Sequence, residues 1–141
     1  KMHWFYTHLP GGESVAQVCD RLRLNIIERL HRQTQEEKSR VIIVSHGDVM
    51  RAFRTLFEGL TGQHFHDNPE YYKVGNGHLL HYTRVDPHRP EVVKPEFGWV
   101  RSVNPIDPTY GGHDWQPIER KCLNNEELLI LANQSVRLIN E

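Results

Sequence analysis

The sequence has only two cysteines, Cys19 and Cys122, with neither metal-cluster spacing nor the density of a small disulfide-stapled secreted domain. It has no apolar run near the roughly 20 residues that a membrane-spanning helix needs, and its first residues contain no signal-peptide core. Its formal net charge is -1 at pH 7, so no overall field attracts nucleic acid or anionic lipid. We therefore expect a cytoplasmic protein that binds neither membranes nor nucleic acid.

The composition suits one folded domain. Of the 141 residues, 38% are hydrophobic and 25% are charged, which is typical of a globular protein with a single core. The chain opens with Lys in an aromatic-rich segment, "KMHWFYTHLP", which no strand or helix precedes. We therefore expect the chain to be the C-terminal part of a longer polypeptide.

Hydrophobic periodicity predicts two helices that flank one strand. Apolar residues recur at helical spacing from Ser14 to Gln33, and Ser14 with Gln17 has the pattern of a capping box. Residues 41–44, "VIIV", are uniformly apolar, as in a strand that is covered on both faces, usually in a parallel sheet. A second amphipathic pattern follows from Gly47. This order predicts an α/β fold with helices packed on a mostly parallel central sheet.

A histidine and a glycine stand where the predicted strand meets the second helix, in "VIIVSHGDVMR". Ligands of open α/β sheets bind beyond the carboxyl ends of the strands, where the start of a helix directs free N–H groups and positive charge. Gly47 lets an oxyanion approach the backbone, and His46 adds an imidazole that donates a hydrogen bond or a charge. The residues alone leave two interpretations equally open, a phosphate or carboxylate site and a histidine that hydrogen-bonds a nearby carbonyl.

The segment "LPGGES" before the first helix, taken together with "VIIVSHGDVMRAF", resembles the histidine phosphatase superfamily in its phosphoglycerate mutase-like branch. The resemblance covers about residues 9–85 and includes "VGNGHLLHYTRV", which is similar to the family's next strand. It implies a three-layer α/β/α fold of the phosphoglycerate mutase type. It also implies that His46 is the second histidine of a catalytic pair and that the Gly47 backbone helps to hold the phosphoryl group.

The resemblance also implies substrate contacts before the first helix. Glu13 and Ser14 match the "GES" motif, and His8 and Tyr6 lie in the stretch where family members often place variable substrate contacts. Glu13 has an equally weighted alternative role, which is to complement the helix dipole. Arg51, one turn after His46, is expected to pair with a neighbouring acid.

Two features of the family are absent. Members carry an Arg-His-Gly motif on their first strand, whose histidine is phosphorylated, and an acidic proton donor between that strand and "GES"; this sequence has neither. We therefore expect an incomplete sheet. For the complete protein the resemblance implies phosphomonoester hydrolysis, or related phosphoryl transfer, through a phosphohistidine, on a phosphorylated small molecule and without a metal or cofactor. The alternative is a catalytically inactive interaction or scaffold module that keeps the frame of the fold.

Residues 86–141 differ in character from the 9–85 segment, although we treat 1–141 as one domain. They are rich in proline and weakly periodic, which predicts an extended wrapping segment with a short strand at 99–103. A capped helix is predicted from Asn124 to Ile139. Three roles of this helix remain open: covering the sheet, closing over the pocket, or a homodimer contact.

The sequence has ten histidines, and histidine is a common metal ligand. His64, His66, His78 and His81 are the relevant ones, but no cysteine or carboxylate completes a set. His78 and His81 would also face opposite sides of a strand. We therefore expect no metal site.

Overall fold

The computed structural model of the chain describes residues 5–8, 10–33, 39–71, 73–107, 109, 114–120 and 123–139. Its first long helix has three parts, which are α1 (Val15–Leu22), the π-helical segment η1 (Arg23–Ile27) and α2 (Glu28–Gln33). After residues 39–46 come α3 (Gly47–Glu58) and the short α4 (Gly62–Asp67). The helices predicted over 14–33 and from Gly47 are therefore confirmed.

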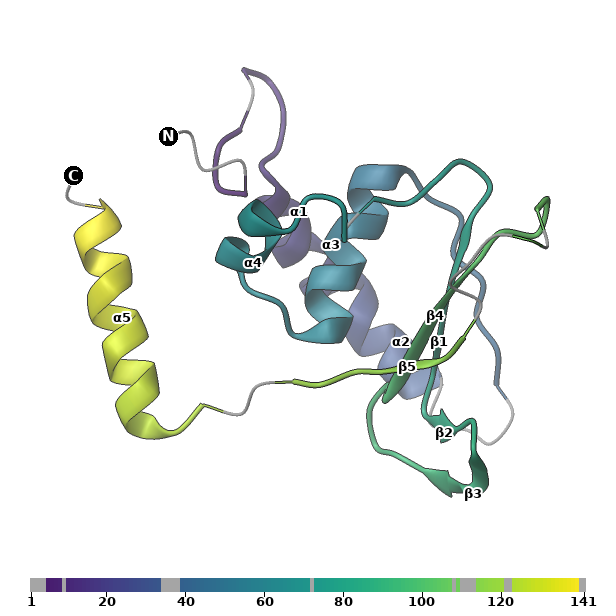
Figure 1. Cartoon of the computed structure of the whole chain (residues 1–141). Helices are drawn as coiled ribbons and strands as arrows, with labels where there is room; N and C mark the ends of the chain where they lie inside the picture. The colour runs from purple at the N-terminus through teal and green to yellow at the C-terminus, as the bar shows by residue number, and fades with distance from the viewer. Residues whose placement is uncertain are drawn as a thin grey trace.

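The described residues form two small antiparallel sheets (Figure 1). The strands are β1 (Leu79–Thr83), β2 (Val85–Asp86), β3 (Arg89–Val93), β4 (Trp99–Val103) and β5 (Gln116–Pro117). β1, β4 and β5 form one sheet in that order, and β2 pairs with β3 as a hairpin. The last helix, α5 (Asn125–Ile139), lies to one side of the other elements.

The amino end of α1 has the predicted capping box. The Ser14 hydroxyl accepts a hydrogen bond from the Gln17 N–H at 3.2 Å, and the Gln17 side chain accepts one from the Ser14 N–H at 2.8 Å. These two bonds satisfy backbone donors that the helix itself leaves without partners. The local sequence is therefore sufficient to fix where this helix begins.

The π-helical turn of η1 adjusts which side of the long helix faces the core. Leu22, before it, and Leu30, after it, are both buried. In a regular α-helix, two positions eight residues apart differ by about 80° around the axis. The wider turn of η1 advances less per residue and so keeps both leucines on the core face.

The hydrophobic core lies between the first long helix and α3. Its buried side chains are Phe5, Cys19, Leu22, Leu30, Ala52 and Phe53. On the sheet side of α3, the Phe57 ring packs edge-on against Tyr82 of β1, with 5.0 Å between ring centroids. α3 ends at Gly59, whose left-handed backbone (φ 67°) needs the conformational freedom of glycine. α3 therefore joins the helical core to the sheet.

The strand predicted at 41–44 is wrong for this structure. Residues 39–46 contain no strand, and the Ile42 and Val44 side chains are 88% and 94% exposed. A strand exists only with a hydrogen-bonded neighbour, and no described backbone group pairs with these four residues. Both sheets are antiparallel, so the expected three-layer α/β/α arrangement around a parallel sheet is not confirmed.

The segment after residue 85 contains more strand than predicted. The strand at 99–103 is confirmed, as is the C-terminal helix. β2, β3 and β5 were not predicted, because the segment is rich in proline and weakly periodic. Pro90 of β3 and Pro117 of β5 lie on strands with a single neighbour, where a missing N–H costs little.

Candidate active site

α1 and α3 lie side by side and run in the same direction. The Cys19 thiol lies 3.8 Å from the Ala52 carbonyl oxygen, and further along both helices Ile27 and Leu56 line one pocket. The amino ends of the two helices therefore lie at the same end of the molecule (Figure 1). Four of the sequence-predicted site residues lie at these two helix ends, namely Glu13 and Ser14 at α1 and His46 and Gly47 at α3.

His46 and Gly47 form the amino end of α3. His46 is the N-cap residue, it is exposed, and its imidazole makes no hydrogen bond to a described residue. The first backbone N–H groups of α3 consequently have no side-chain cap at this position. A methyl group built on Gly47 would meet no atom within 4 Å, so the packing of the chain itself does not require glycine there.

Glu13 and Ser14 form the amino end of α1 but have different surroundings. Ser14 is buried in the capping box. Glu13 is exposed and accepts hydrogen bonds from Arg21 at 2.9 and 2.7 Å, which lower the pKa of its carboxyl group. The predicted pairing of Arg51 with an acid is also found, since its guanidinium lies 3.5 Å from Asp48.

Tyr6 and His8 are both exposed. Tyr6 lines a groove of about 570 Å³ between the first described residues, α1 and the turn from α3 to α4. Cys19 also lines this groove, and burial, followed by the charge of Asp20, raises the pKa of its thiol to about 11. His46 does not line the groove, so the structure does not bring Tyr6 together with the predicted catalytic histidine.

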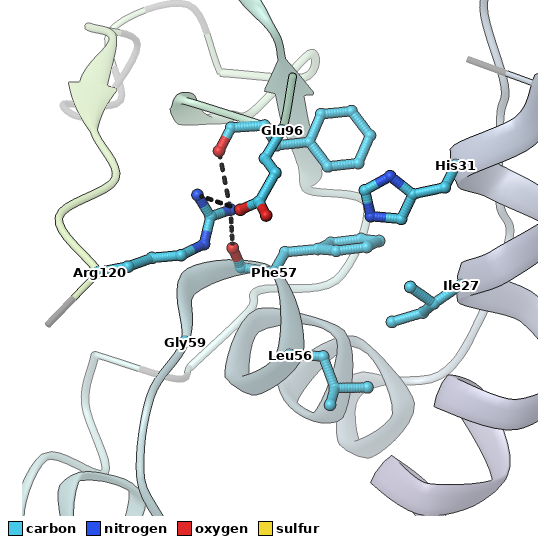
Figure 2. Close-up of a pocket in the computed structure, with 8 residues that line it drawn as sticks. Ile27, His31, Leu56, Phe57, Gly59, Glu96 and Arg120 are labelled. Atoms are coloured by element: carbon cyan, nitrogen blue, oxygen red, sulfur yellow. Dashed lines mark hydrogen bonds and ion pairs between the residues drawn. The ribbon is translucent and has the colours of Figure 1, made fainter. Parts of the chain in front are cut away.

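A second pocket, of about 270 Å³, lies at the carboxyl end of α3 (Figure 2). Arg120 reaches across it and donates to the backbone carbonyl oxygens of Phe57 at 2.5 Å and Phe97 at 2.8 Å. The same guanidinium pairs with Glu96 at 3.2 Å. Arg120 therefore ties the chain after β5 to the end of α3, far along the helix from His46.

Glu58 is a buried carboxylate that no local sequence pattern indicates. Arg54 donates to it at 2.9 Å, Tyr82 at 2.7 Å, and Tyr71 also donates its hydroxyl. Burial is the main cause that raises the pKa of both tyrosines, followed by Glu58. The cluster joins α3 to β1 and to the loop between α4 and β1.

A second unpredicted cluster lies on the outer face of the three-stranded sheet. Two N–H groups of Arg101 lie 3.3 Å from His81 Nδ1, and the guanidinium carbon lies 4.5 Å from the centroid of the Trp115 ring. Only the strand register brings His81 and Arg101 together, and periodicity within one segment does not reveal such a pairing.

Within the described residues, no group of three or more His, Cys, Asp or Glu side chains is arranged to hold a metal ion. His64 and His66 lie on α4, whereas His81 lies on β1. Among the described helices, none combines the length and apolarity needed to span a bilayer.

Comparisons with known proteins place the chain in a family. No curated protein and no solved structure matches it. The model of the histidine phosphatase superfamily (branch 1) matches residues 1–94, which is about two thirds of the chain and includes both helix ends described above. The chain belongs to the histidine phosphatase superfamily.

Proposed function

We propose that this chain supplies the second catalytic histidine and part of the phosphate site of a phosphatase, which hydrolyses phosphomonoesters through a phosphohistidine or performs a related mutase-like transfer. The superfamily generally consists of phosphatases and mutases that act on phosphorylated substrates. The proposed substrate is a phosphorylated small molecule, and the proposed reaction needs neither metal nor cofactor. On cysteine usage, the proposed compartment is the cytoplasm.

The open amino end of α3 is the observation that carries this proposal. An exposed, unbonded His46 stands beside backbone N–H groups that no side chain caps. Gly47 is exposed, and a Cβ built on it would meet no atom within 4 Å, so a phosphoryl oxygen has access to its backbone. The positive end of the helix dipole favours an anion at the same point.

In the proposed reaction, His46 stabilises the charge that develops on the transferring phosphoryl group, and the Gly47 N–H donates a second hydrogen bond. Glu13, Tyr6 and His8 are proposed as substrate-side residues. Ser14 is buried in the capping box, so its proposed contribution is to position the start of α1.

The nucleophilic histidine is not in this chain, because none of its 141 residues forms an Arg-His-Gly sequence. We propose that the strand carrying it pairs with residues 41–44, whose apolar side chains are exposed in the structure. Such pairing would turn these residues into a strand of a parallel sheet, with helices covering both faces in a three-layer α/β/α fold.

The test is p-nitrophenyl phosphate hydrolysis, measured in the presence of a chelator, by the full-length polypeptide that contains this chain. His46→Ala is expected to lower kcat by about a hundredfold or more, because it removes a donor to the transition-state charge. His88→Ala is the matched control, since His88 is an exposed histidine on the β2–β3 turn.

Metal-independent turnover that only His46→Ala abolishes supports the proposal. Equal turnover of the His46→Ala variant and the unchanged protein contradicts the assigned role of His46. Absence of turnover in the unchanged full-length protein favours the inactive scaffold alternative.

A further inference from the structure

Three side chains form a row across the outer face of the sheet of β1, β4 and β5. His81 and Arg101 are directly opposite each other in the register. β5 pairs Gln116 with Val100, so Trp115, the preceding residue, comes next to Arg101 on the same face. The opposite face carries Tyr82 and Val100, which pack toward the core side.

The geometry holds the Arg101 guanidinium in one place. His81 Nδ1 accepts from Arg101 Nε at 3.3 Å, and the Trp115 ring lies under the guanidinium at 4.5 Å. The His81 and Trp115 ring centroids are 4.7 Å apart, so the two rings support the cation together. A guanidinium that is stacked in this way is weakly hydrated and presents its remaining N–H groups in a fixed fork.

The charge of this row is not neutralised within the described part of the chain. Arg101 forms no ion pair with a described carboxylate, and its Nη1 donates to no described acceptor. Burial, followed by the charges of Arg101 and Arg40, lowers the pKa of His81, which favours the neutral ring that accepts from Arg101. The positive charge of Arg101 therefore faces solvent without a described carboxylate beside it.

We propose that His81, Arg101 and Trp115 form a second anion-binding site, separate from His46, whose ligand is a phosphate group. The oxygens of a phosphate suit the paired N–H groups of a guanidinium, and the two rings hold that guanidinium in a fixed orientation. The three residues come from β1, from β4 and from the position before β5, whereas His46 caps α3.

The experiment is an NMR titration of the three tryptophan indole N–H signals with inorganic phosphate at constant ionic strength. Trp115→Phe assigns the signal. We expect a saturable shift of the Trp115 signal, an affinity at least about tenfold weaker in Arg101→Gln, and an unchanged affinity in His46→Ala. Arg32→Gln, an exposed arginine of α2, is the matched control.

A linear shift, or a shift that sodium chloride reproduces, overturns the proposal. So does a shift that persists in Arg101→Gln or disappears in His46→Ala. If Arg101→Gln does not fold, Arg101→Lys decides, because lysine keeps the charge on the sheet but lacks the planar fork, so binding is expected to weaken. The last titrations use AMP and phosphoserine in place of inorganic phosphate. If either binds more tightly than inorganic phosphate, the ligand is a phosphomonoester; if their affinities are equal, the ligand is free phosphate.

Discussion

Replacing Glu58 with glutamine should destabilise the fold strongly while barely changing its shape. The Glu58 side chain is 3% exposed and that of Arg54 is 12% exposed, so their ion pair is shielded from water. Glutamine keeps one acceptor oxygen but removes the negative charge, which leaves the Arg54 guanidinium buried without a counter-charge. Breaking a buried pair from one side costs about 3–5 kcal/mol, and we expect a loss near the lower figure because the amide oxygen retains one hydrogen bond.

Urea unfolding of the Glu58→Gln variant, followed by circular dichroism, measures this loss as a fall in the transition midpoint at unchanged slope. Glu70→Gln is the matched control, because Glu70 pairs with Lys73 at 3.4 Å on the surface and its loss should cost less than about 1 kcal/mol. The double variant Arg54→Met with Glu58→Leu should lose less stability than Glu58→Gln alone, since no charge remains buried. A Glu58→Gln variant within about 1 kcal/mol of the unchanged protein would refute the reasoning.

Three further predictions concern other described contacts. Burial and Glu58 raise the pKa of Tyr82 in the folded state above the pKa of about 10 that a tyrosine has in the unfolded chain. The free energy of unfolding is therefore highest below about pH 10 and decreases as the pH rises above it. Urea midpoints between about pH 8 and 11 should show this decrease, and the decrease should be smaller in Tyr82→Phe. Because the pKa of Cys19 is about 11, only about 0.1% of the thiol is ionised at pH 8, and in a Cys122→Ser background its reaction with a disulfide reagent should be slow until urea unfolds the chain. Arg120→Ala should cost about 1–3 kcal/mol by leaving two backbone carbonyls without their donor, and a variant with an unchanged urea midpoint would contradict this role.

Local signals in the sequence predicted the helices well. Ser14 with Gln17 marks a helix start through contacts that lie within a few residues. The histidine at the junction of 41–44 with α3 was found by the same kind of local reasoning, because a strand-like run that passes directly into a helix places residue 46 at the helix start.

The remaining features depend on contacts between distant segments. Apolar composition alone cannot make 41–44 a strand, because the ladder must come from another stretch of backbone. The Glu58 cluster joins residues up to 24 positions apart, and His81 meets Arg101 across 20 positions. Such partners follow from the register and the packing of elements, which hydrophobic periodicity in one segment does not specify.

The π-helical turn lets the long first helix hold one residue more than a regular helix needs to bring Leu22 and Leu30 to the same face. Deleting one residue between Arg23 and Ile27 would let a regular α-helix form there, a gain for local backbone geometry. The two leucines would then be seven positions apart, about 20° around the axis, so both would still face the core. Straightening the turn without a deletion would instead rotate α2 by about 80° and turn Leu30 away from the core and His31 away from the pocket that it lines. The π-helical turn therefore absorbs one additional residue without changing which side of α2 is buried.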